Sequence, residues 1–558
     1  MTGFQTVLLI IFGFLLVIGV LIFAGILPGF RAPAGGVGGT VVWWGTIPQD
    51  TINSLLSPFQ EKYQKDFSLV YVEKDRRTIE SEFVDALARG GGPDIISFPQ
   101  EWVLRQGDKI FPIPYESLSR RTFQDTFIRE GELYLTQDGA LGLPFYLDPL
   151  VLYYNKDMFS NAKLAVVPKT WTELQEVIGK FVEKDAAGNL RQSAIALGRF
   201  NNIIHAKDIL ALLFFQAGNP LVSLLEETPQ VVLKESFGFS KAPAGEALAF
   251  FNLFSNPTNL LYSWNSALKE GREVFVSGNL AMYLGYASEY SRLRQQNPNL
   301  NFDVTLVPQR GRTPFMTFGR LVALSVVKNS QNRATAVQAA ALLTGGEFSK
   351  QLADALLLAP ARNDLLNLGH QDPFMSVFYQ SAIISRGWLD PAPDTSLAIF
   401  RKLSEDTQAG KLSVNDAIER AHEELADALN KTLKKFGFAI FNIASAAGLV
   451  PCVGSTAGGT GASEGQCDFY MLLDLIQRVT DFLIFTIGVP AAAIAIMIGG
   501  WLIVTAGGNE SKISNGKKIV WAAVIGLVIV LGAWLIVKTI IEYLGAEGSV
   551  PIPTEPSG

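Results

Sequence analysis

The stretch TVVWWGTIPQDTINSLLSPFQEKYQKDFSLVYVE, residues 40–73, joins two kinds of apolar pattern. Short apolar runs at 40–45 and 67–73 are typical of strands, and the segment between them has apolar residues at helical spacing. The alternation continues with RTIESEFVDALARG, residues 77–90, and PDIISF, residues 93–98. It predicts an α/β fold with a mostly parallel sheet and helices on both faces.

Ligands of such open sheets bind beyond the carboxyl ends of the strands. Two of the predicted strand ends carry Trp43 with Trp44, and the run FPQEW at 98–102. Because neighbouring side chains on a strand point to opposite faces, at least one of the two tryptophans is expected in the core.

Length and charge set broad limits on function. The chain has 558 residues, enough for roughly three or four domains, and a formal net charge of −6. Nucleic-acid binding needs a basic face, and the sequence has no dense Lys/Arg run, so no nucleic acid is expected as a partner. Residues 40–435 have ordinary mixed charge, whereas both ends of the chain are apolar.

The first apolar run, residues 6–27, exceeds the roughly 20 residues that cross a bilayer. No Lys or Arg precedes it and no clean A-x-A site follows it, so we interpret it as an uncleaved transmembrane anchor. A cleaved signal peptide is the alternative. The Gly/Pro-rich residues 28–39 then form a flexible linker.

Two further uncharged runs, 482–506 and 519–537, flank the polar segment GGNESKISNGKK at 507–518. This segment is rich in lysine, and acidic residues predominate beyond both runs. Basic loops stay in the cytoplasm, so a transmembrane hairpin is predicted with its turn inside and everything back to Gly39 outside. Small residues in both runs allow close helix packing, within the chain or between copies.

The segment KTLKKFGFAIFNIASAAGLVPC, residues 431–452, combines lysines, a short apolar core and A-S-A, which is a signal-peptide pattern in mid-chain. A relic signal, a cleavage site and an amphipathic helix on the membrane surface remain alternatives. Cys452 and Cys467 are expected to form a disulfide if this part lies outside, and to be free thiols in a reducing cytosol.

The run GALGLPFYLDPLVLYYNKDMF, residues 139–159, followed by VPKTWTELQEVIGKF, resembles the central signature of family 1 bacterial extracellular solute-binding proteins. These are the maltose-binding-like receptors of ABC importers. Three more blocks agree in order: GGGPDIISF, residues 275–290 and residues 318–362. The resemblance covers about 40–430.

This resemblance implies a two-lobed periplasmic-binding-protein fold, type II-like, that closes over a ligand, with LPFYLDP as the first crossover between lobes. The expected division of the chain is an anchor and linker at 1–39, lobe 1 at about 40–147 and 309–355, lobe 2 at about 148–308 and 356–430, a linking segment at 431–481, the membrane hairpin at 482–545 and a polar tail at 546–558.

A second resemblance lies within about 440–545. The runs GLVPC, LLDLIQRVTDFLIF and KKIVWAAVIGLVIVLGAWLIV are similar to the small two-helix pilin subunits of type IV secretion systems. It implies self-association through the hairpin, which competes with the role of a simple anchor.

Carbohydrate sites combine aromatic faces with carboxylates. The residues expected to bind the ligand are Trp44, Phe98, Glu101, Trp102, Asp148, Tyr286, Glu289 and Trp388. The resemblance places Asp148 where maltose-binding members have a ligand-binding acid, although an Asp before Pro149 is also a common turn residue. It places Ala287 where those members have a stacking tryptophan, so it does not imply maltodextrin.

Catalysis has little support. The three histidines, His205, His370 and His422, are far apart, and no metal-ligand spacing or nucleophile motif is present. No catalytic residue, metal or cofactor is therefore expected. A glycoside hydrolase that uses Glu101 with Asp148 is the disfavoured alternative.

The expected function is that of a receptor anchored in the bacterial cytoplasmic membrane, with its binding domain on the extracytoplasmic face. Its expected partners are a small solute, in particular a sugar, an ABC permease encoded elsewhere, and the lipid bilayer. The alternative is a pilin-like membrane assembly subunit of a type IV secretion system that displays a binding domain.

Overall fold

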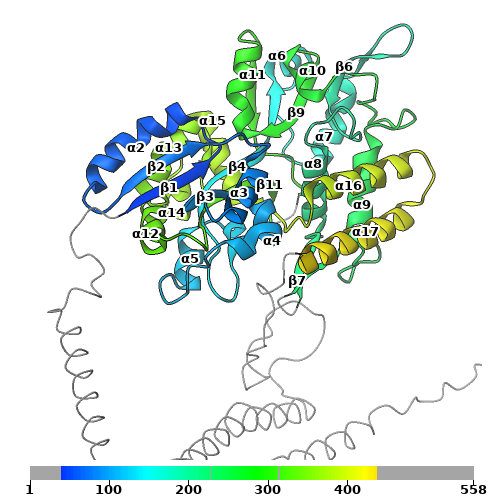
Figure 1. Ribbon diagram of the computed structural model, residues 1–558. Coiled ribbons are helices and arrows are strands. Elements are labelled where there is room, and N and C mark those ends of the chain that lie inside the picture. The colour runs from blue at the N-terminus through cyan, green and yellow to red at the C-terminus, as the bar shows by residue number, and fades with distance from the viewer. Residues whose placement is uncertain (1–38, 226–227, 312–313, 436–558) are drawn as a thin grey trace, which may run out of the picture. The chain divides into compact units, whose positions relative to one another are not determined.

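A computed structural model of the chain describes residues 39–225, 228–311 and 314–435 (Figure 1). The chain divides into two compact units, Met1–Asn442 and Ile443–Gly558, and the described residues belong to the first. The predicted anchor at 6–27, the cysteine pair and the membrane hairpin lie outside the described residues. Within those residues no helix has both the length and the apolar character needed to cross a membrane.

The first lobe is built on three parallel strands in the order β2-β1-β3, and the alternation read from residues 40–98 is confirmed. They are β1 (Thr40–Gly45), β2 (Ser68–Glu73) and β3 (Ile95–Pro99), connected by the helices α2 (Gln49–Tyr63) and α3 (Ile79–Ala88). The buried residues of α2 are spaced three or four apart, so this helix turns one apolar face to the sheet.

Two long strands carry the sheet from the first lobe into the second. β11 (Thr317–Val326) runs antiparallel to β3 and to the first half of β4 (Leu143–Asn155). The second half of β4 pairs instead with β9 (Leu280–Tyr286) and β10 (Phe302–Thr305). β4 therefore belongs to both lobes, and the sequence LPFYLDP within it lies at the crossover, as the resemblance implied.

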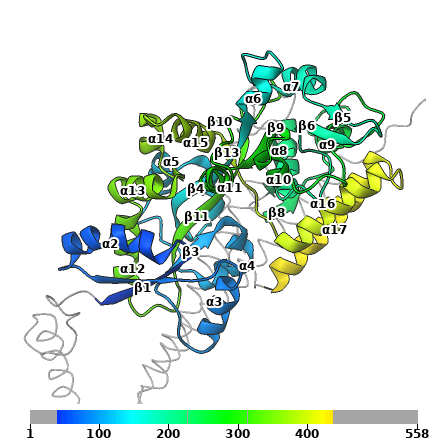
Figure 2. The ribbon, with the colours of Figure 1, turned by 90° about the horizontal axis from the view of Figure 1, so that it is seen from above.

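The second lobe continues the sheet with β6 (Leu190–Ile195) and β5 (Glu183–Lys184) and covers it with helices. Its central helix, α8 (Ala206–Ala217), is apolar on almost every side and is buried nearly throughout. It packs against α9 (Pro243–Leu253) and α16 (Pro393–Gln408). Figure 2 shows α16 and α17 (Val414–Lys435) side by side along this lobe.

The remaining elements are short connections and covering helices. They are α4 (Val103–Gln106), α5 (Arg120–Thr126), α6 (Lys156–Asn161), α7 (Trp171–Val177), β7 (Val222–Leu225), β8 (Thr228–Val231), α10 (Gly271–Val276), α11 (Tyr290–Gln296), α12 (Arg333–Leu343), α13 (Gly346–Leu356), β12 (Ala359–Pro360), α14 (Asn363–Leu368), α15 (Pro373–Ile383), β13 (Ser385–Arg386) and the 3-10 turns η1 (Gln100–Trp102), η2 (Gly107–Lys109), η3 (Arg129–Tyr134), η4 (Ile178–Lys180) and η5 (Ala287–Glu289).

Candidate functional site

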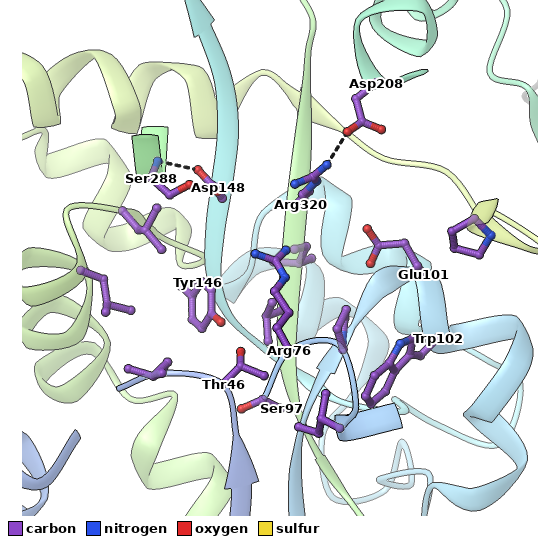
Figure 3. A pocket seen from close by; sticks show the side chains of 18 of the residues that line it. Thr46, Arg76, Ser97, Glu101, Trp102, Tyr146, Asp148, Asp208, Ser288 and Arg320 are labelled. Atoms are coloured by element: carbon purple, nitrogen blue, oxygen red, sulfur yellow. Dashed lines mark hydrogen bonds and ion pairs between the residues drawn. The ribbon is translucent and has the colours of Figure 1, made fainter. Parts of the chain in front are cut away.

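A cavity of about 550 Å³ lies at the carboxyl edge of β1, β2 and β3, where the two lobes face each other (Figure 3). Its volume is within the range of small-molecule sites. The first lobe contributes the residues that follow the three strands, the second lobe contributes the start of α8 and the turn η5, and the crossing strands β4 and β11 lie between them. The cavity is lined, among others, by Thr46, Arg76, Ser97, Glu101, Trp102, Arg105, Tyr146, Asp148, Lys207, Asp208, Ser288 and Arg320.

The end of β1 is fixed by close packing beneath the cavity. Trp43 is fully buried, and its Nε1 donates a hydrogen bond to Ser97 Oγ on β3 at 3.0 Å. A Cβ on Gly45 would lie 2.8 Å from that same Oγ and 2.9 Å from the ring of Tyr71. Only glycine fits this close approach, so the chain can turn at Gly45 and place Thr46 at the cavity.

Asp148 lies on β4 at the crossover, directly opposite Arg320 on β11. Its carboxylate accepts hydrogen bonds from Ser288 N at 2.9 Å and from Ser288 Oγ at 2.6 Å. Burial raises the pKa of Asp148 above its ordinary value, and these bonds offset only part of the effect. Each carboxylate oxygen keeps further acceptor capacity, so Asp148 can also receive hydrogen bonds from a ligand.

Arg320, Asp208 and Tyr286 form one bonded group. Arg320 Nη2 donates to Asp208 Oδ2 at 2.6 Å, the Tyr286 hydroxyl donates to the same oxygen at 2.7 Å, and the guanidinium lies 4.0 Å from the centroid of the Tyr286 ring. Burial opposes ionisation of Asp208, but Arg320 and Lys207 outweigh it and lower its pKa. This part of the cavity is therefore ionised and fixed in position.

A buried acid supports this group from behind. Glu289 accepts hydrogen bonds from Tyr286 N at 3.0 Å and from the Tyr283 hydroxyl at 2.8 Å, and its Oε1 lies 2.6 Å from His205 Nε2. Burial alone would raise the pKa of Glu289, but His205 and the other donors lower it to about 2. Glu289 thus orders Tyr286, which in turn holds Asp208.

Three of the eight ligand contacts predicted from the sequence line the cavity: Glu101, Trp102 and Asp148. The other five do not line it. Trp44 is half-buried, with Lys74 Nζ 4.0 Å from the centroid of its ring, and Phe98 is in the core against Trp102. Tyr286 and Glu289 are buried behind the cavity, and Trp388 is stacked on Phe400 with 6.0 Å between the ring centroids.

Several lining residues were not singled out from the sequence, although the sequence pattern around two of them, Asp208 and Arg320, indicates a special role. Asp208 is the one acid of the mostly apolar helix AKDILALLFFQA, and Arg320 is the one charge of the strand TFGRLVALSV. A charged side chain inside a buried element needs a partner. These two residues are partners of each other.

In the described part of the chain, no group of His, Cys, Asp and Glu is arranged to hold a metal ion. The cavity is lined instead by positively and negatively charged side chains, which supply hydrogen-bond donors and acceptors. Such a lining suits a polar organic molecule.

The model of the bacterial extracellular solute-binding protein family matches residues 54–375, which is more than half of the chain. The chain belongs to this family. A second family model, that of the type IV secretion system pilin, matches residues 472–540 of this solute-binding protein. Both resemblances read from the sequence are thereby confirmed. A comparison with curated proteins finds no match.

Solved structures share the two-lobed fold. The cyclic α-maltosyl-1,6-maltose binding protein of Arthrobacter globiformis superposes with a TM-score of 0.58 at 16% identity, over 71% of this chain and 99% of its own. The GacH receptor of Streptomyces glaucescens, solved unliganded and with acarbose, gives 0.53 at 18% identity, over 72% and 99%. A solute-binding protein of Thermotoga lettingae, bound with α-D-tagatose, gives 0.53 at 21% identity, over 70% and 100%.

Proposed function

We propose that this protein is a membrane-anchored extracytoplasmic receptor that binds a carbohydrate and presents it to an ABC permease. The observation that carries the proposal is the cavity between the lobes, with Asp148 held by Ser288 at the crossover strand. Membership of the solute-binding family supports it, and so do the sugars bound in the similar structures.

Binding would proceed by closure of the lobes about the crossing strands β4 and β11. Asp148 accepts hydrogen bonds from sugar hydroxyls, and Tyr146 and Trp102 offer aromatic surface to the C–H face of the ring. Arg320 is already oriented by Asp208, so its remaining N–H groups can donate to the ligand without further ordering.

A thermal-shift screen of the purified full-length chain against saccharides, polyols and peptides tests this proposal. A ligand present at about 100 times its Kd raises the free energy of unfolding by about 2.7 kcal/mol. We expect stabilisation by at least one saccharide. Stabilisation by peptides alone would contradict the carbohydrate assignment.

The same proposal holds that the protein binds its solute without converting it. Its family is one of binding proteins, and Asp148 is engaged by Ser288 rather than paired with a second acid. Incubation of the saccharide identified in the screen with the protein should return it unchanged. Hydrolysis of that saccharide would establish an enzyme in its place.

We place the binding lobes outside the cell, held by residues 6–27 and by the hairpin at 482–545, with the domain boundaries expected from the sequence. The support is the charge distribution around the hairpin and the extracellular family of the lobes. An impermeant thiol reagent should not label a Ser514→Cys variant in intact cells. Strong labelling there would place the turn of the hairpin outside.

The pilin match supports a second candidate, a membrane assembly subunit that displays the lobes as cargo. The small residues of the two apolar runs would then pack between copies rather than within one chain. Crosslinking in native membranes separates the two candidates. A ladder of large oligomers that collapses in Gly499→Leu and Gly526→Leu variants would favour the assembly, and a monomer or weak dimer favours the anchored receptor.

A further inference from the structure

Four basic side chains line the cavity, and three of them have an acidic partner. These ion pairs, with N–O distances of 2.6 or 2.7 Å, are Arg320–Asp208, Lys207–Asp390 and Arg105–Glu80. The fourth basic residue is Arg76, in the loop after β2. Arg76 makes no ion pair or hydrogen bond with any residue that the structure describes.

The charged residues next to Arg76 in the chain are paired with one another and not with Arg76. Lys74 pairs with Glu82 at 2.7 Å, and Arg77 pairs with Asp75 at 3.4 Å while its side chain is 89% exposed. Asp75 and Glu82 are thus each paired with a basic neighbour of Arg76. Figure 3 shows the Arg76 side chain reaching between Tyr146 and Glu101 toward the centre of the cavity.

The acids that line the cavity are also directed elsewhere. Asp148 receives both hydrogen bonds of Ser288. Glu101 contributes to the raised pKa values of Lys207 and Arg320, so its charge acts on those two cations. A guanidinium that closes into a cleft without a counter-charge loses hydration that nothing replaces.

We propose that Arg76 binds an anionic group of the ligand, and that the solute is an acidic saccharide of the uronate type. This inference rests on the function proposed above. A guanidinium presents two parallel N–H groups that match a carboxylate, and it is more weakly hydrated than an ammonium. The prevalence of charged over aromatic residues in the lining agrees with a charged sugar.

Isothermal titration of the full-length chain tests the proposal with uronate disaccharides of gluco and galacto configuration and with the matched neutral disaccharides. We expect at least one uronate to bind about tenfold or more tightly than its neutral counterpart, because a charge-assisted bidentate contact is lost in the latter. Arg76→Gln should remove this preference, and Arg76→Lys should keep part of it.

Arg77→Gln is the matched control, because Arg77 neighbours Arg76 and does not line the cavity. It should bind like the wild type. Equal or tighter binding of the neutral sugars, or an Arg76→Gln variant that keeps the preference, would overturn the role of Arg76 and leave the receptor standing. A sugar phosphate that binds more tightly than any uronate would overturn the carboxylate assignment. Absence of binding by every sugar in a folded protein would overturn the proposed function as well.

Discussion

The two sides of the cavity are built differently. On the side of the second lobe, Lys207 is paired with the buried Asp390, and Asp208 belongs to a bonded group that continues into the buried residues Tyr286 and Glu289. On the side of the first lobe, Arg76 and Glu101 stand in loops after β2 and β3, and neither has an ion-pair partner in the described chain.

This difference separates two tasks that one cavity must perform. The second-lobe side is ordered before any ligand arrives, so its groups contribute to folding stability and present a fixed surface. On the first-lobe side Arg105 is paired with Glu80, but Arg76 and Glu101 have no ion-pair partner among the described residues, so these two side chains contribute little to stability. Substitutions on the second-lobe side should therefore change stability, and those on the first-lobe side should change affinity.

The largest effect is expected for Arg320→Met. It leaves the buried carboxylate of Asp208 without the guanidinium 2.6 Å away, and removal of one partner of a buried pair costs about 3–5 kcal/mol. Chemical denaturation should show this loss of unfolding free energy. Lys350→Met is a control, because Lys350 pairs with Asp354 at the same distance on the surface of α13, where we expect a much smaller change. Equal losses in both variants would show that the second-lobe side is not specially ordered.

Glu289→Gln should have the next largest effect. The pKa of Glu289 falls from an ordinary value of 4.5 to about 2, and this difference corresponds to about 3 kcal/mol of stability at neutral pH. Because the folded-state pKa is the lower one, this stability is present above the unfolded pKa and is lost as the pH falls toward 2. Unfolding curves of wild type and variant should converge in that range.

Glu101→Gln supplies the matched change on the first-lobe side. Its effect on the unfolding free energy should stay within about 0.5 kcal/mol at neutral pH, because Glu101 has no ion-pair partner among the described residues. A loss as large as that of Glu289→Gln would remove the contrast between the two sides.

Asp148→Asn should act on affinity instead. Burial raises the pKa of Asp148, so its charge does not stabilise the folded state, and the amide should not lower stability. Loss of a charge-assisted acceptor should weaken binding of the identified saccharide about tenfold or more. As the pH is lowered, Asp148 should become protonated at a higher pH than an ordinary aspartate, and the affinity of the wild type should fall at that point. The variant should show no such fall. Titration calorimetry across pH measures both.

The α/β class could be predicted from local pattern and the two-lobed fold from the family resemblance, whereas the site could be predicted only in part. Strand and helix periodicities around β1–β3 are properties of single segments, so they are visible in the sequence. Asp208 and Arg320 are 112 positions apart, and their pairing arises only when α8 packs beside β11. The sequence likewise does not show which of two adjacent tryptophans faces the core, or that Trp388 stacks on Phe400.

Trp44→Ala should have the smallest effect on affinity, and it sharpens the comparison on the first-lobe side. The sequence pattern predicts Trp44 as a stacking surface for the ligand, whereas in the structure its ring lies beneath Lys74 Nζ at 4.0 Å and does not line the cavity. Loss of the cation–π contact should cost about 1 kcal/mol of stability.

Affinity for the saccharide should change less than about twofold in this variant, because Trp44 does not line the cavity and a residue outside the contact area contributes little to binding. Trp102→Ala is the matched comparison, because Trp102 lines the cavity after the neighbouring strand β3. A larger loss of affinity in Trp44→Ala than in Trp102→Ala would mean that lobe closure brings the end of β1 onto the ligand. The first-lobe side would then bind through its aromatic residues, and the charges of Arg76 and Glu101 would be secondary.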